Sequence, residues 1–155
     1  MRHRRKGFSL LELLIVFVLV GVLSMIAWPR MGQMRETYRI QSAKQQLMAA
    51  ITTARAAAVQ KGRTARFRVN GNVMSAVVRT SATDSTYVVR PKNLLQEFAV
   101  TIVPGNPGDT LVTWEARGFG RVSPAPLRLI IQGATKADTV CVGAIGQLMP
   151  RGCSL

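Results

Sequence analysis

The stretch KGFSLLELLIVFVLVGVLSMIAWPR, residues 6 to 30, decides how this chain is organised. From Phe8 to Trp28 it holds one ionisable side chain, that of Glu12. A helix of this length rises about 31 Å, which is the thickness of the hydrocarbon core of a bilayer. An acidic residue at the centre of such a helix costs roughly 2.5–3.5 kcal/mol, and a carboxylate inside a membrane segment indicates a function.

Two simpler explanations of the apolar segment are a secretory signal peptide and a plain signal anchor. The segment is longer than the 7–15 apolar residues of a signal peptide, and no A-x-A site follows it. Neither explanation accounts for Glu12. A basic leader favours a cytoplasmic N-terminus, although three arginines also follow the segment. The leader contains Arg2, Arg4, Arg5 and Lys6, and the later arginines are Arg30, Arg35 and Arg39.

The junction at Gly7 offers Glu12 a counter-ion. A cut between Gly7 and Phe8 would leave a cationic amine four residues before Glu12, on the same helix face. Glu12 would also lie in the first turn, where the helix dipole favours an anion. A paired charge is tolerated in a low-dielectric setting where a lone charge is not.

The basic leader, Gly7, Phe8 and Glu12, followed by an unbroken apolar helix, resemble the type IV pilin and pseudopilin signature. The resemblance implies that a prepilin peptidase cuts after Gly7 and that Phe8 is N-methylated. It also implies that Glu12 pairs with the Phe8 amine of a neighbouring subunit and sets register in a filament. Pro29 matches the proline commonly found where the family's helix leaves the bilayer.

The pattern stays helical beyond Pro29, which could kink or divide a helix. Apolar residues recur at steps of three and four, and Gly62 provides a C-cap. We therefore predict one helix from Phe8 to Gln60, with a transmembrane or filament-core segment at 8–28 and a periplasmic half at 29–62. The apolar residues at these steps form one stripe along the helix, and they are Ile40, Ala43, Leu47, Ala50, Ile51, Ala54 and Ala58.

Beyond Gly62 the period changes to two, and NGN at 70–72 predicts a hairpin. The predicted fold class is α+β and pilin-like: a long N-terminal transmembrane helix packed on an antiparallel sheet that occupies residues 63–155. Most aromatic residues of this domain fall at strand positions that predict core, and GFGRVS at 118–123 is predicted to be a turn. Further strands are predicted at 85–90, 97–103, 110–114, 126–132 and 138–144.

The segments AAAVQKGRTARFRV at 56–69 and WEARGFGRV at 114–122 are similar to the GspH/FimT-like class of H-type pseudopilins and T-type minor pilins. That class comprises minor subunits of type II secretion pseudopili and of type IV pili. Some T-type members carry a G-R-x-R motif associated with DNA contact near the C-terminus. The nearest stretch here, residues 146–151, does not match it.

The two cysteines and the scarcity of histidine limit the chemistry. Cys141 and Cys153 would lie in an oxidising compartment, which favours a disulfide. Metal binding is the alternative, but a site needs about four ligands and the one histidine, His3, lies in the leader. The scattered acids and the missing general base argue against an enzyme. We predict no cofactor and no metal.

The net charge of +14 bears on what the protein binds and not on its fold. Without the leader, 17 basic side chains face 7 acidic ones, a net +10. The basic surface could lie near anionic lipid headgroups or acidic pilin neighbours, or it could capture DNA phosphates. The residues predicted for such DNA or partner contact are Arg66, Arg68, Arg117, Arg121, Arg128 and Arg151.

The sequence thus predicts a non-enzymatic minor pilin or pseudopilin with a single pass through the bacterial inner membrane and a periplasmic globular domain. Its expected partners are other pilins or pseudopilins in a filament, prepilin peptidase and inner-membrane lipid. A DNA receptor for natural transformation on the same scaffold is the alternative.

Overall fold

The computed structural model describes residues 9–81, 83–108, 110–122, 126–149 and 153. The chain divides into two compact units, Met1–Arg35 and Glu36–Leu155. The helix α1, Leu10–Lys61, contributes to both units and continues through Pro29. Its end agrees with the predicted end within one residue, while Phe8 lies outside the described residues.

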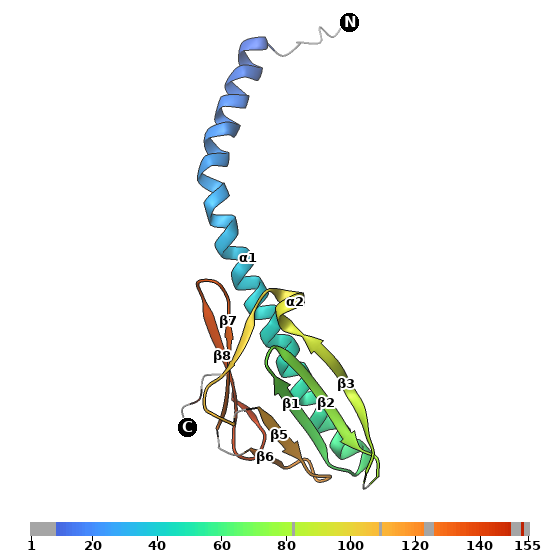
Figure 1. The fold of residues 1–155 in the computed structure, drawn as a ribbon. Coiled ribbons are helices and arrows are strands. Elements are labelled where there is room, and N and C mark those ends of the chain that lie inside the picture. The colour runs from blue at the N-terminus through green and yellow to red at the C-terminus, as the bar shows by residue number, and fades with distance from the viewer. Residues whose placement is uncertain (1–8, 82, 109, 123–125, 150–152, 154–155) are drawn as a thin grey trace, which may run out of the picture. The chain divides into compact units, whose positions relative to one another are not determined.

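Two antiparallel sheets make up most of the second unit. The first has the strand order β3-β2-β1-β5-β6, and the second has the order β4-β7-β8-β9 (Figure 1). A short helix, α2, Leu94–Phe98, separates β3 from β4. The strands are β1 Ala65–Asn70, β2 Val73–Arg79, β3 Ser85–Asn93, β4 Thr101–Pro104, β5 Leu111–Trp114, β6 Gly120–Val122, β7 Leu127–Gln132, β8 Ala137–Val142 and β9 Leu148–Met149.

The α+β prediction is confirmed, but the structure has two sheets instead of the predicted one. The strand predicted at 97–103 is confirmed only from Thr101 onward, where β4 begins, because residues 97 and 98 belong to α2. Asn93 caps α2, because its side chain accepts hydrogen bonds from Leu95 N at 3.0 Å and Gln96 N at 3.4 Å. Leu94 is fully buried beneath this turn. The chain therefore leaves the first sheet after β3, and β4 pairs with β7 of the second sheet.

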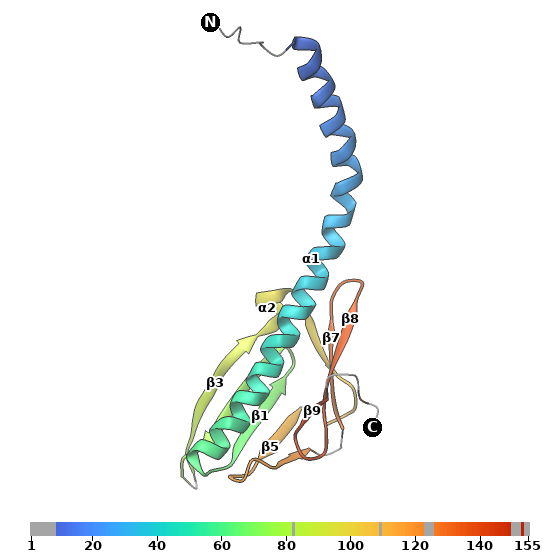
Figure 2. The ribbon, with the colours of Figure 1, turned by 180° about the vertical axis from the view of Figure 1, so that it is seen from behind.

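The helical stripe forms one wall of the core. Figures 1 and 2 show the second-unit part of α1 lying across one face of β1, β2 and β3. The stripe residues are buried, and so are the alternate residues of β1 that face them. Gly62 ends the helix with φ +59°, and Arg63 N donates to Ala58 O at 3.0 Å. The buried β1 residues are Ala65, Phe67 and Val69.

A close backbone contact joins the two sheets beside Trp114. Gly120 of β6 lies so near Gly146, in the turn between β8 and β9, that a Cβ on Gly120 would meet the Cα of Gly146 at 2.6 Å. Gly120 N donates to Ile145 O at 2.9 Å. The indole of Trp114 is fully buried here, and its Nε1 has no hydrogen-bond partner among the described residues. The predicted turn at 118–123 is therefore partly a strand, β6.

A carboxylate at the start of the second unit holds the turn between β7 and β8. Glu36 accepts hydrogen bonds from Thr135 N and Thr135 Oγ1, both at 2.6 Å, and from Lys136 N at 3.0 Å. Gly133 lies close beneath this carboxylate, since a Cβ there would be 2.6 Å from Glu36 Oε1 and would displace the glutamate side chain. The Thr135 hydroxyl, followed by the backbone N–H of Thr135 and that of Lys136, lowers the pKa of Glu36.

This geometry predicts a pH-dependent contribution of Glu36 to stability. Because its folded-state pKa is lowered, the contribution is present above the ordinary glutamate pKa of about 4.3 and is lost as pH falls through the lower folded value. In Glu36→Gln, the free energy of unfolding by urea should differ less between pH 7 and pH 3 than in the native protein. Thr135→Ala should reduce the difference in part. An equal pH dependence in Glu36→Gln would contradict the assignment.

Candidate functional site

Glu12 lies in the first turn of α1, as the sequence predicts. The backbone N–H groups of Glu12 and Leu13 donate to Ser9 O at 3.0 and 3.2 Å, which places Ser9 at the start of the helix. Gly7 and Phe8, the predicted cleavage and methylation residues, lie outside the described residues. The pairing of Glu12 with the Phe8 amine therefore stays a prediction.

Ser9 and Glu12 also have the spacing of a capping box, S-x-x-E. In that motif the glutamate lies at the third helical position and reaches back to the backbone N–H of the capping residue. The spacing is visible in the sequence, and it predicts a local capping role for Glu12 besides the predicted pairing with an amine. Both roles use an anion at the positive end of the helix dipole.

The apolar side chains that follow Glu12 are uncovered within this chain. Every described residue from Ser9 to Met25 is exposed, including Phe17 and the leucines around it. A helix that is apolar on all sides is normally buried in lipid or protein. In the part of the chain that the structure describes, no helix is both long enough and apolar enough to cross a membrane.

Three of the predicted basic residues lie on the outward face of the first sheet. Arg66 and Arg68 are the exposed residues of β1 that alternate with its buried ones. Arg66 pairs with Thr113 of β5, and Thr113 pairs with Arg121 of β6. Strand pairing therefore brings Arg66 and Arg121 into one row across the sheet.

The same row contains an aromatic residue that the sequence assigned to the core. On the other side of Arg66, Val77 of β2 pairs with Tyr87 of β3. Tyr87 is 57% exposed. Most aromatic residues of the domain were predicted to lie in the core. Phe67 and Trp114 are fully buried, and Phe98 is partly buried. Tyr87 and Phe119 are exposed, so the prediction is wrong for them.

The other predicted basic residues do not join this row. Arg117 is exposed in the turn between β5 and β6. Arg128 is exposed on β7, which belongs to the second sheet. Arg151 lies outside the described residues. The five arginines that the structure describes thus do not form a single surface.

Cys141 and Cys153 form a disulfide bond, with their Cα atoms 5.3 Å apart. Cys141 pairs with Arg128, which is exposed, so both residues belong to the outward face of the second sheet. Cys141 is nevertheless fully buried. The disulfide therefore holds Cys153 against the outer side of this sheet.

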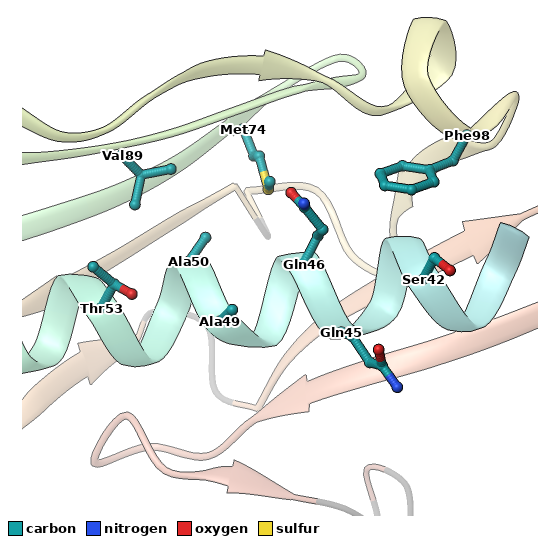
Figure 3. Close-up of a pocket in the computed structure, with 9 residues that line it drawn as sticks. All are labelled: Ser42, Gln45, Gln46, Ala49, Ala50, Thr53, Met74, Val89 and Phe98. Carbon is teal, nitrogen blue, oxygen red and sulfur yellow. The ribbon is translucent and has the colours of Figure 1, made fainter.

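A groove of about 530 Å³ lies between α1, the strands β2 and β3, and α2. Figure 3 shows Met74, Val89 and Phe98 opposite the helix residues that line it. None of the lining residues titrates near neutral pH. Within the described residues, no three His, Cys, Asp or Glu side chains gather as a metal ion would require. The remaining lining residues are Ser42, Gln45, Gln46, Ala49, Ala50 and Thr53.

Comparison with protein families matches residues 2–28 to the prokaryotic N-terminal methylation motif. Comparison with solved structures finds the type IV minor pilin FimU of Pseudomonas aeruginosa, strain PAO1, in two crystal forms. The first has a TM-score of 0.58 and 19% identity, and the match covers 77% of this chain and 98% of FimU. The second has a TM-score of 0.54 and 19% identity, with 74% and 99% covered. Comparison with curated protein sequences gives no match.

The chain thus combines the N-terminal methylation motif with a fold similar to that of a type IV minor pilin. At 19% identity, the likeness to the minor pilin FimU concerns the fold. The motif also suggests a membrane-anchored N-terminus.

The disulfide closes a short loop and should stabilise the second unit. On the chain-entropy model, a loop of this length contributes about 3 kcal/mol. In residues 30–155, Cys153→Ser should lower the free energy of unfolding by urea by about 2–4 kcal/mol. Reduction of the native fragment should give the same loss and should leave Cys153→Ser unchanged. A native midpoint that does not respond to reductant would contradict the structural role.

Proposed function

We propose that this protein is a non-enzymatic minor pilin or pseudopilin, a subunit of a type IV pilus or of a type II secretion pseudopilus. The observation that carries the proposal is the methylation motif at residues 2–28 on a chain with a minor-pilin fold. A prepilin peptidase removes residues 1–7 by cutting after Gly7, and Phe8 becomes the methylated N-terminal residue. The partners are other pilins or pseudopilins in a mixed filament.

The exposed apolar helix supports this assembly. In the precursor, inner-membrane lipid covers the side chains that follow Glu12, and in the filament neighbouring helices replace the lipid. Residues 8–28 form the membrane and filament-core segment, residues 29–62 form the periplasmic half of the helix, and residues 63–155 form the β-rich domain. The basic leader orients the N-terminus toward the cytoplasm. The Cys141–Cys153 disulfide suits the oxidising periplasm.

Glu12 sets the junction between subunits in this proposal. Removal of the leader creates an amine at Phe8, and the Glu12 carboxylate of a neighbour neutralises it as the subunit leaves the bilayer. In a low-dielectric core, an unpaired member of such a pair is strongly unfavourable. Correct axial register is the arrangement that leaves neither charge without a partner.

Substitution of Glu12 separates processing from assembly. In cells that have a prepilin peptidase, Glu12→Ala should be inserted and cleaved normally but should reach filaments at a level at least tenfold lower. Intact mass should show methylated Phe8 as the first residue of both proteins. Glu12→Asp, which keeps the charge, should assemble better than Glu12→Ala. Recovery of a chain that retains residues 1–7 would contradict the proposal and favour a plain signal anchor.

DNA uptake is the second candidate function, and the outward row of the first sheet favours it. The row places the exposed Tyr87 on the same face as Arg66 and Arg121, and Arg68 follows two residues later on β1. Guanidinium groups bind phosphates, and an exposed aromatic ring can stack on a base. Arg121 also forms an ion pair with Glu115 at 3.1 Å, which competes with phosphate.

Gel-shift titration of residues 30–155 with DNA tests this second function. Binding should weaken steeply with salt, and Arg66→Ala with Arg68→Ala should lower the slope of log K against log salt by about 2. Arg39 is an exposed arginine on α1, so Arg39→Ala is the matched control. It should leave DNA binding unchanged if the first sheet makes the contact. No binding at low salt, or equal losses from the control, would exclude this surface as a DNA site.

A further inference from the structure

A small polar pocket lies on the outward face of the first sheet. It is found where β1 begins and β2 ends, near the end of α1 (Figure 1), and its volume is about 170 Å³. Pockets for drug-sized ligands are about 300–1,000 Å³, whereas one water molecule takes about 30 Å³ of the liquid. The pocket therefore has room for one ion of a few heavy atoms. We call it the Arg66 pocket, and its lining residues are Thr64, Arg66, Val77, Arg79, Thr83, Asp84 and Ser85.

Strand pairing explains why these side chains meet. Arg66 of β1 pairs with Val77 of β2. Arg79, two residues further along β2, pairs with Ser85 of β3, and its backbone N–H donates to Thr64 O at 2.9 Å. Residues two apart on a strand share a face, so the two rows lie next to each other on the outward side. The half-buried Val77 is thus the neighbour of both arginines, and its shorter side chain leaves the hollow between them.

The turn between β2 and β3 is ordered around the pocket. The backbone N–H groups of Thr80 and Ser81 donate to Asp84 O at 2.9 and 3.2 Å, and Asp84 N donates to Ser81 Oγ at 3.0 Å. The guanidinium of Arg63, just after α1, donates to Thr80 O. A site whose backbone is already ordered loses little conformational freedom when it binds a ligand.

The lining groups are suited to an oxyanion. A guanidinium presents five N–H donors in a planar fork, which matches the paired oxygens of phosphate-like groups and carboxylates. Arg66 and Arg79 approach the hollow from neighbouring strands, so they can hold different oxygens of one ligand. Three hydroxyl groups can donate further hydrogen bonds, those of Thr64, Thr83 and Ser85. Donors on several sides favour a tetrahedral group over a planar carboxylate.

An acid in the lining restricts the charge of the ligand. Asp84 Oδ1 accepts a hydrogen bond from Ser85 N at 2.8 Å, which fixes the carboxylate at the start of β3. Two guanidinium groups and this carboxylate give the lining a net charge of +1. A singly charged anion balances that charge, while a doubly charged one is repelled more strongly by Asp84. Phosphodiesters and sulfate esters carry one negative charge, whereas a phosphate monoester carries about −1.5 to −2 at pH 7.

We propose that the Arg66 pocket binds a singly charged tetrahedral oxyanion, the group that a phosphodiester or a sulfate ester presents. Arg66 and Arg79 pair with its oxygens, the hydroxyl groups donate to it, and Asp84 selects against a second negative charge. This proposal goes beyond both candidate functions, since the pocket takes one ester group and needs neither filament assembly nor a strand of DNA.

Thermal unfolding of the full chain in a nonionic detergent tests the proposal. Dimethyl phosphate and methyl sulfate, each singly charged, replace chloride at pH 8 and constant ionic strength, and methyl phosphate is the doubly charged comparison. A ligand that binds only the folded state raises the midpoint. At about 50 mM, at least one of the two singly charged esters should raise it by about 3 °C, and methyl phosphate should raise it less. The ester that acts identifies the source of the group. No rise with either ester, or an equal rise with methyl phosphate, would overturn the proposal.

Substitutions locate the effect in the pocket. Arg66→Ala and Arg79→Ala should each reduce the ester-induced rise to about a third or less, because each removes a charged donor. Arg68 is exposed on the same face of β1, two residues further on, but does not line the pocket. Arg68→Ala is therefore the matched control and should keep the full rise. Equal losses in Arg68→Ala and Arg66→Ala would overturn the proposal in favour of diffuse attraction to the basic sheet, and would leave the proposed function intact.

The role of Asp84 has its own variant. Asp84→Asn keeps an oxygen that can accept from Ser85 N but removes the negative charge. The rise produced by methyl phosphate should therefore increase about twofold or more in this variant, while the midpoint in chloride reports whether the fold is intact. An unchanged response to methyl phosphate in a folded Asp84→Asn would overturn the selection for a single charge.

Discussion

The contact between the apolar stripe of α1 and the inner face of β1 and β2 is the interaction on which the second unit depends. Many of the stripe residues are alanines, which let the helix approach the sheet closely, and Leu47 and Ile51 fill the space that remains. Opposite them lies Phe67, also fully buried. Each other feature of this unit, from the Glu36 contact to the seam at Trp114, is built around that packing.

The same helix has two different surroundings along its length. From Ile40 onward one face is buried by the chain itself, whereas between Leu10 and Met25 no described side chain is buried. The first pattern specifies a folded domain, and the second requires lipid or other proteins. A subunit that moves from lipid into a filament needs one helix with both segments, one that packs in its own domain and one that is apolar on all sides. The proposed function follows from this division together with the methylation motif.

Local patterns in the sequence were enough to predict the helix, its end at Gly62 and the hairpin of β1 and β2, because neighbouring residues determine these features. The start of α2 was missed although Asn93 is a favourable N-cap, since the apolar residues after it also fit a strand. The division into two sheets and the row of Tyr87, Arg66 and Arg121 depend on pairing between distant strands, which periodicity does not report. Glu12 could be singled out from the sequence because one charge in an apolar segment is conspicuous, and its pairing with the Phe8 amine stays a prediction.

The seam beside Trp114 has a practical consequence. The indole is fully buried where Gly120 and Gly146 bring the two sheets into backbone contact, so any separation of the sheets would admit water to the ring. Its emission spectrum would then shift to longer wavelength while the helical signal of α1 stayed constant. Trp114 is therefore an intrinsic fluorescent probe of partial opening in the second unit. In a fragment that begins after Trp28 it is also the sole tryptophan, so the signal needs no further assignment.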